Sequence, residues 1–180
     1  MGERFIYLLF RENLDEVDTE AIRLQVEEEF LLPTRVQKIK IDLRPYFDAN
    51  RRQFHSTMIL KGLLKKVPPK AEKALLIVDV DLFIPILTFV FGEAQLGGKV
   101  GIVSLARLRQ EFYSLPPNLA LLHRRLIKEI KHELGHTFGL IHCSQRECVM
   151  SVAHNVLAVD QKGMGLCRGC KDFLLKALKR

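Results

Sequence analysis

Three histidines and one glutamate stand close together in the second half of the sequence. His132 and His136 are four residues apart, a spacing that on a helix lets both rings converge on one metal ion. Glu133 follows the first histidine, where its carboxylate can face a metal-bound water rather than the metal. These residue types at these spacings predict a zinc site that activates water.

A third nitrogen ligand would come from beyond the helix. Gly139 lies three residues after His136, and glycine readily adopts the left-handed conformation that ends a helix. The chain could then turn back so that His142 supplies the third nitrogen. Three protein ligands leave the fourth position to water, as in catalytic zinc sites. Such a site lowers the pKa of the water toward about 7, and Glu133 would accept its proton as general base.

All four cysteines follow the third histidine in two close pairs. Cys143 and Cys148 form the first pair, and Cys167 and Cys170 form the second. Two pairs separated by about 15 to 20 residues are typical of a structural zinc with four thiolate ligands. Disulfides and free thiols are the alternatives. Because His142 and Cys143 are adjacent, we expect the two metal sites to share a loop.

The motif H-E-x-x-H-x-x-G-x-x-H over residues 132–142 resembles that of the metzincin zinc peptidases. The cysteines that follow make the chain similar to the archaemetzincins. The resemblance implies peptide-bond hydrolysis, a catalytic zinc on the histidines and a second, structural zinc on the cysteines. It also implies that residues 93–99 form an edge strand that pairs with substrate, and that Met150 belongs to the turn beneath the catalytic metal. A core methionine is the alternative for Met150.

The rest of the chain must supply the elements that position these residues. Short apolar runs predict strands, with the central strand at residues 74–80. Apolar residues at helical spacing predict a backing helix and a long active-site helix that ends at Gly139. The other predicted strands are residues 4–10, 36–41, 89–95 and 100–104, and the predicted helices are residues 15–30, 51–66, 114–138 and 171–179.

We therefore expect one α/β (α+β) domain over residues 1–180 with a metzincin-like zincin fold. An N-terminal subdomain, residues 1–139, would hold a mixed twisted sheet of four or five strands, the backing helix and the active-site helix. A short C-terminal subdomain, residues 140–180, would be organised by the four-cysteine zinc site.

The composition is that of a folded globular protein, with 48% hydrophobic and 27% charged residues and no low-complexity tract. The apolar run at residues 5–10 is too short for a signal peptide, and no run approaches the roughly 20 residues that span a bilayer. We therefore expect a cytoplasmic protein, in which the cysteines stay reduced.

The net charge is +7, and residues 31–70 carry ten basic side chains against two acidic ones. A non-catalytic module with two zinc ions, binding nucleic acid or a protein partner, is therefore an alternative to an enzyme. It would leave Glu133 and the open zinc position unexplained. A hydrolase of another amide or ester is a further alternative. We expect a monomeric zinc metalloprotease that acts on peptides or proteins, with no membrane or nucleic-acid partner.

Overall fold

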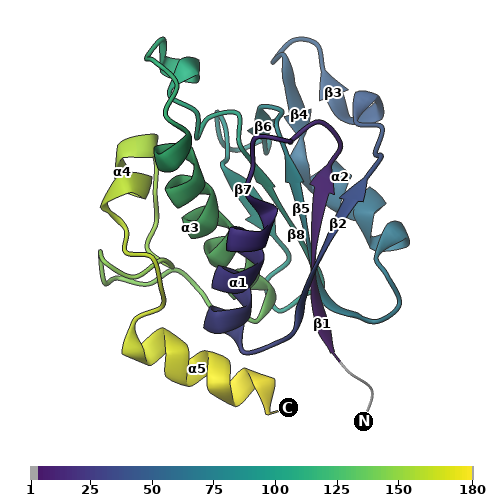
Figure 1. Ribbon diagram of the computed structural model, residues 1–180. Coiled ribbons are helices and arrows are strands. Elements are labelled where there is room, and N and C mark those ends of the chain that lie inside the picture. The colour runs from purple at the N-terminus through teal and green to yellow at the C-terminus, as the bar shows by residue number, and fades with distance from the viewer. Residues whose placement is uncertain (1–3, 180) are drawn as a thin grey trace.

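The main sheet has five strands in the order β2-β1-β5-β8-β7 (Figure 1). Neighbouring strands are parallel except for β7, which runs antiparallel to β8. This computed structural model describes residues 4–179. The strands are β1 (Phe5–Arg11), β2 (Thr34–Ile39), β5 (Ala71–Val78), β7 (Gly92–Ala94) and β8 (Val100–Ser104). The expectation of a mixed sheet in an α/β fold is therefore confirmed.

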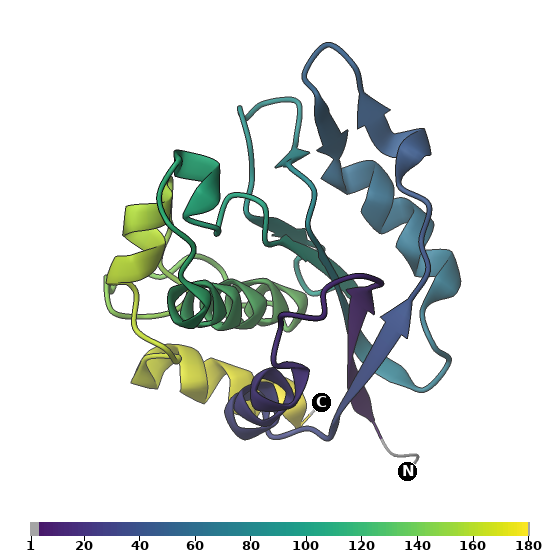
Figure 2. The same cartoon turned by 45° about the horizontal axis from the view of Figure 1, so that its top comes forward.

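Helices cover both faces of this sheet. Figure 2 shows α1 (Thr19–Phe30) and α3 (Leu119–Thr137) on one side and α2 (Ser56–Leu63) on the other. The central strand β5 explains this layering, because its alternate side chains enter two different cores. Leu75 and Ile77 join the core beneath α1 and α3, whereas Leu76 and Val78 join the core beneath α2. A parallel strand buried on both faces reads as a continuous apolar run.

A smaller sheet of three short strands includes the first part of the segment predicted as a helix over residues 51–66. It is formed by β3 (Phe47–Asp48), β4 (Gln53–His55) and β6 (Leu82–Phe83). Phe54 lies in β4, with its ring centroid 5.0 Å from that of Phe47, so the helix begins only at Ser56. On the helix that does form, Leu63 is buried, whereas Met58 is 44% exposed.

The first helix begins later than the predicted start at residue 15, and one of its charged residues faces the interior. The side chain of Asp18 accepts a hydrogen bond from the backbone N–H of Ala21 and so caps α1. Glu29, near the end of the same helix, is buried. Its carboxylate lies 3.2 Å from the Nζ atom of Lys131 on α3, and this ion pair explains how a charged side chain can face the interior.

The active-site helix α3 starts at Leu119 rather than at Ser114. Asn118 caps it by accepting a hydrogen bond from the N–H of Leu121, and Pro116 and Pro117 precede the helix instead of occupying its first turn. The apolar residues that recur at helical spacing along this helix are buried from Leu122 onward. The buried members are Leu122, Leu126, Ile130 and Leu134.

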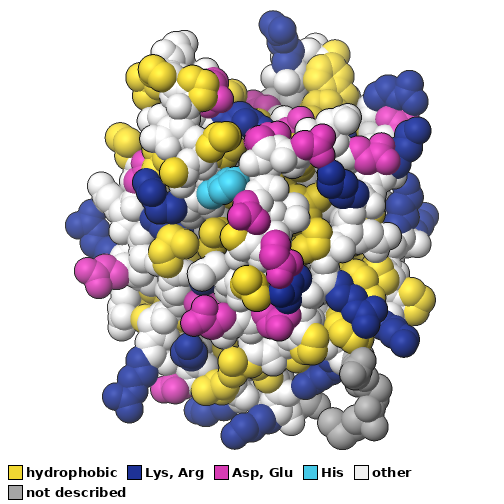
Figure 3. Space-filling view, in the orientation of Figure 1, with side chains coloured by type: hydrophobic (Ala, Val, Ile, Leu, Met, Phe, Trp, Pro, Cys, Tyr) yellow, Lys and Arg dark blue, Asp and Glu magenta, His cyan; other side chains and the backbone are white. Residues whose placement is uncertain are grey.

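The C-terminal segment packs back against α3 and α1. It contains α4 (Val156–Gln161) and α5 (Arg168–Leu178), and Val159 and Leu174 join the core beneath α1 and α3. Three single turns, η1 (Arg44–Tyr46), η2 (Leu64–Lys66) and η3 (Glu111–Tyr113), complete the structure. On the face shown in Figure 3, basic and acidic side chains are interspersed. Within residues 4–179, none of the helices is both long and apolar enough to cross a membrane.

Candidate metal centre and active site

The rings of His132 and His136 converge at the C-terminal end of α3. Their Nε2 atoms lie 3.1 Å apart. Each Nδ1 atom lies against a backbone carbonyl, that of Val149 at 2.9 Å for His132 and that of Leu140 at 2.7 Å for His136. Because a carbonyl oxygen only accepts, each Nδ1 carries the proton and each Nε2 keeps a free lone pair. Both rings are thus oriented with a metal-binding nitrogen toward the same point.

His142 reaches the same point from the loop that follows the helix. Gly139 has a φ of 92°, and the N–H of Leu140 bonds to the carbonyl oxygen of Gly135, so the chain reverses as expected. The ring centroid of His142 lies 5.3 Å from that of His132 and 4.9 Å from that of His136. One ring nitrogen from each of the three histidines falls within 4.8 Å of the others.

These three nitrogens fit a single zinc ion. Tetrahedral zinc with Zn–N bonds of roughly 2.0–2.1 Å holds its nitrogens roughly 3.3 Å apart, close to the separation of the two Nε2 atoms on α3. Burial lowers the pKa of His132, His136 and His142, because the surroundings disfavour a charged ring. Neutral imidazole is the form that binds metal.

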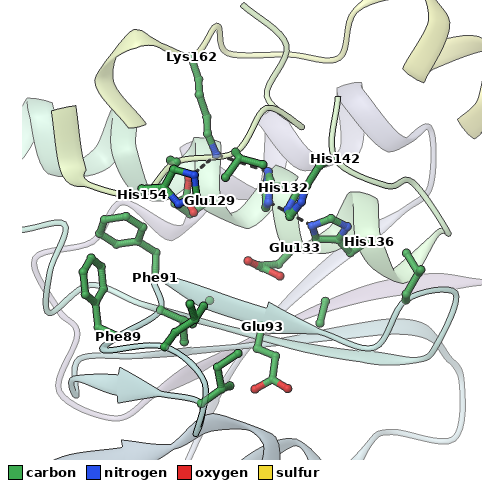
Figure 4. A pocket seen from close by; sticks show the side chains of 18 of the residues that line it. Phe89, Phe91, Glu93, Glu129, His132, Glu133, His136, His142, His154 and Lys162 are labelled. Atoms are coloured by element: carbon green, nitrogen blue, oxygen red, sulfur yellow. Dashed lines mark hydrogen bonds and ion pairs between the residues drawn. The ribbon is translucent and has the colours of Figure 1, made fainter. Parts of the chain in front are cut away.

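Glu133 is buried beside the three histidines. Figure 4 shows its carboxylate projecting from the helix toward the sheet, on the cavity side of the histidine rings. Burial raises the pKa of Glu133 well above its usual value, and the charges of Glu129 and Glu93 act in the same direction. A carboxyl group in such surroundings can both accept and return a proton near neutral pH.

A cavity of about 690 Å³ lies between α3 and the edge of the main sheet. One wall carries the histidines and Glu133, and the other carries β7 and the residues before it. Most of the remaining lining is apolar, including the rings of Phe89 and Phe91, whose centroids are 5.2 Å apart. The lining residues are Ile84, Leu87, Thr88, Phe89, Val90, Phe91, Gly92, Glu93, Ala94, Leu96, Glu129, His132, Glu133, His136, Ile141, His142, Val152, Ala153, His154 and Lys162.

The edge strand beside this cavity is shorter than expected. β7 ends at Ala94, and residues 95–98 form a turn in which the N–H of Gly98 bonds to the carbonyl oxygen of Gln95. The Glu93 carboxylate points away from the histidines (Figure 4) and accepts hydrogen bonds from the hydroxyls of Ser56 and Thr57. Glu93 therefore fixes the edge strand to the start of α2.

Met150 is fully buried directly beneath the active-site helix. A Cβ atom added to Gly135 would lie 2.4 Å from its Sδ atom, so the absence of a side chain at Gly135 is what lets the methionine approach. The carbonyl oxygen of Met150 accepts a hydrogen bond from the N–H of Cys143 at 3.0 Å. This bond joins Met150 to the residue that follows His142.

The four cysteine sulfurs form a second cluster close to the first. All four thiols are free, and one sulfur from each lies within 4.8 Å of the others. The Sγ atoms of Cys143 and Cys167 are 3.8 Å apart, the separation that Zn–S bonds of roughly 2.3 Å give in a tetrahedron. Hydrogen bonding from the backbone N–H of Cys170 lowers the pKa of Cys167 to about 7. The predicted pairs therefore meet as four convergent thiols, without disulfides.

Comparison with known proteins decides between the alternatives for the whole chain. The family model of peptidase family M54 matches residues 6–176. The archaemetzincin of Methanocaldococcus jannaschii is 47% identical over 132 residues, which cover 73% of this chain and 72% of the relative. The chain belongs to the archaemetzincins, peptidase family M54. As a member of this family it is a zinc-dependent metalloprotease, so the comparisons favour the enzyme over the non-catalytic binding module.

Solved archaemetzincin structures have the same fold. The crystal structure of the Methanopyrus kandleri archaemetzincin superposes with a TM-score of 0.84 at 33% identity and covers 99% of this chain and 97% of that one. A zinc-dependent peptidase of Methanocorpusculum labreanum gives a TM-score of 0.85 at 28% identity, with 94% and 99% covered. Metalloproteinase-II of Bacteroides fragilis, at 15% identity and a TM-score of 0.54, shares the fold alone. The expected metzincin-like architecture is thus confirmed.

Three further residues lie at this site that the ligand spacing in the sequence does not predict. Glu129 lies four residues before Glu133, a helical spacing that could have indicated a second carboxylate on the cavity side. Gly92 gives no signal of its own, although a Cβ atom there would lie 2.8 Å from Oε1 of Glu133. Lys162 is 30 residues from His132 in sequence, so only the fold brings it to the cavity.

Proposed function

We propose that His132, His136 and His142 hold the catalytic zinc of this metallopeptidase and that Glu133 is its general base. The assignment rests on the convergence of one ring nitrogen from each of the three histidines. In two of these rings, His132 and His136, the other nitrogen is held by a backbone carbonyl. The donor set of three neutral imidazoles is that of catalytic rather than structural zinc.

Bound at this point, zinc would polarise the scissile carbonyl and activate a water molecule. Glu133 would take a proton from that water and pass it to the nitrogen of the departing amine. Its burial supports both steps, because a raised pKa makes the carboxylate a stronger base toward the water, and the acid that forms can still protonate the more basic amine nitrogen. Gly92 leaves the space in which this carboxylate lies.

We further propose that Cys143, Cys148, Cys167 and Cys170 hold a second, structural zinc, so that the chain binds two ions. The second ion would stabilise residues 140–180 as a small subdomain packed on residues 1–139. Met150, buried beneath the active-site helix, would support the first metal site as a methionine turn. A reducing compartment such as the cytoplasm would keep the four thiols available.

The substrate would be a peptide or protein segment that lies extended in the cavity along β7. Free N–H and C=O groups at a sheet edge pair readily with an extended chain. We propose that the protein acts as a monomer.

Substitution of Glu133 by Gln tests the assignment of the base. We expect peptidase activity to fall by a factor of about 10² to 10⁴, with the zinc content and the unfolding temperature unchanged. Glu28→Gln is the matched control, because Glu28 is exposed on α1. Full activity in Glu133→Gln, measured on a peptide library with zinc content checked by atomic emission, would show that another group takes the proton.

A further inference from the structure

A buried ion pair lies directly behind the first histidine. The Nζ atom of Lys162 is 3.0 Å from Oε1 of Glu129, and the two side chains are only 1% and 4% exposed. Figure 4 shows Lys162 reaching down from the C-terminal segment to the helix that carries Glu129 and His132. A buried ion pair often stabilises a protein no better than apolar residues of the same size, so its presence beside a metal site calls for another reason.

The ammonium group of this pair also approaches His132. Nζ of Lys162 lies 3.4 Å from Nδ1 of His132, and the same Nδ1 lies 2.9 Å from the carbonyl oxygen of Val149. Since Nδ1 carries a proton and donates it to that carbonyl, Nδ1 cannot also accept a hydrogen bond from the ammonium group. Lys162 therefore lies against both the ring and Glu129, and it donates a hydrogen bond to the carboxylate.

The carboxylate of Glu129 is the stronger competing acceptor for the proton on Nδ1. It lies one helical turn before His132, and a histidine that binds metal commonly donates its outer N–H to a carboxylate or to a backbone carbonyl. With its Oε1 engaged by Lys162, Glu129 leaves that proton to Val149. The choice of acceptor matters because it sets the orientation and basicity of the ring.

Lys162 and Val149 belong to segments that are tied to each other. The N–H of Gly163 donates to the carbonyl oxygen of Glu147 at 2.9 Å, and the N–H of Val149 donates to that of Gly165 at 3.0 Å. A Cβ atom at Gly163 would lie 2.3 Å from the same Glu147 oxygen, so the approach requires glycine. These hydrogen bonds therefore hold together the carbonyl group that orients His132 and the lysine that pairs with Glu129.

We propose that Lys162 is a positioning residue of the metal centre: by pairing with Glu129 it keeps the outer N–H of His132 on the carbonyl of Val149. This inference rests on the proposed role of His132 as a zinc ligand. Without the ammonium group, Glu129 is an unpaired buried carboxylate next to the ring, and it draws the Nδ1 proton away from Val149. The ring then turns, and zinc binding weakens.

The experiment compares Lys162→Met with the double variant Lys162→Met/Glu129→Gln. For Lys162→Met we expect zinc affinity at the histidine site, measured by chelator competition, to be about ten- to hundredfold weaker. We expect the Nδ1–H resonance of His132 in the zinc-loaded protein to move downfield as a carboxylate replaces the carbonyl. In the double variant no charge is left unpaired, so affinity and resonance should return close to their wild-type values.

Lys128→Met is the matched control for the loss of a buried lysine. Lys128 also ties α3 to the end of α4, through the carbonyl oxygens of Val159 and Asp160 at 3.0 and 2.9 Å. It should lower the unfolding temperature and leave zinc affinity and the His132 resonance unchanged. If Lys128→Met changes both as Lys162→Met does, the role of Lys162 is only structural and the proposal is overturned.

Further outcomes decide the remaining cases. Wild-type affinity and resonance in Lys162→Met, or no recovery in the double variant, would overturn the proposal. If Lys162→Met does not fold, Lys162→Arg, which keeps the charge, and the double variant should both bind zinc like the wild type, and weak binding in both would overturn it. Failure of the proposed function would look different, because the wild-type protein would then bind no zinc at the histidines.

Discussion

Gly92 on the edge strand lies against the side chain of Glu133. A Cβ atom at Gly92 would be 2.7 Å from Cγ of Glu133 and 2.6 Å from the backbone oxygen of Ile102. Between the strand and the carboxylate there is therefore no space for even one methyl group.

Gly92→Ala should cost activity as well as stability. Overpacking of this kind costs about 1–3 kcal/mol, and relief by moving Glu133 would misplace the proposed base. Gly101→Ala in the neighbouring strand is the control, because its Cβ would meet the Leu75 side chain rather than Glu133. Both variants should unfold at lower temperature, measured by circular dichroism. Only Gly92→Ala should lose turnover per folded molecule, and equal turnover in the two would contradict this view of Gly92.

Gly135→Ala should destabilise the protein although alanine is the better helix former. In an open helix position the exchange would stabilise by about 1 kcal/mol, but here the methyl group would lie 2.4 Å from Sδ of the buried Met150. Gly169→Ala, with no atom within 4 Å of the added methyl group, should show the ordinary stabilisation. Urea unfolding of both variants measures the change in the free energy of unfolding. A stabilised Gly135→Ala protein would mean that Met150 moves aside freely.

Cys167→Ser should reduce the zinc content from the two ions per chain that we propose to one. The remaining zinc should also bind more weakly, because Cys143 follows His142 directly and its N–H bonds to Met150. Ser144→Ala, an exposed change on the same loop, is the control. Atomic emission gives the stoichiometry and chelator competition the affinity. Unchanged affinity at the histidine site would show that the two sites are independent.

Glu29→Ala should destabilise the fold by about 3 kcal/mol, because it leaves the buried ammonium group of Lys131 without its carboxylate. It also removes the acceptor for the N–H of Leu166, just before Cys167. The additional change Lys131→Met should recover part of the loss. Guanidinium unfolding measures both, and a double variant as unstable as the sum of the single ones would exclude coupling between the two side chains.

The sequence predicts best the elements whose apolar pattern extends over many neighbouring positions. The central strand is predicted by a continuous apolar run, and the active-site helix by apolar residues that recur at helical spacing over many positions. The histidines and cysteines were found because ligand spacing within a few residues constrains geometry directly. In both cases neighbours in sequence are also neighbours in space.

Features set by distant contacts were missed. Phe54 fits a helical pattern, yet its pairing with Leu82 places it in a strand. Glu29 resembles its exposed neighbour Glu28, and only Lys131 on another helix explains its burial. Lys162 reaches the site through hydrogen bonds between two loops that leave no periodic pattern. Tertiary contacts overrode local preference at each of these positions.

The short edge strand β7 also bears on pairing between copies of the chain. An exposed edge offers free N–H and C=O groups to any extended chain, and natural proteins guard against edge-to-edge aggregation by keeping such strands short. With β7 limited to Gly92–Ala94, the edge can take up a few residues of a peptide. Two copies pairing there would form only a few hydrogen bonds. The brevity of the strand thus limits edge-to-edge pairing between copies of the chain to a few residues.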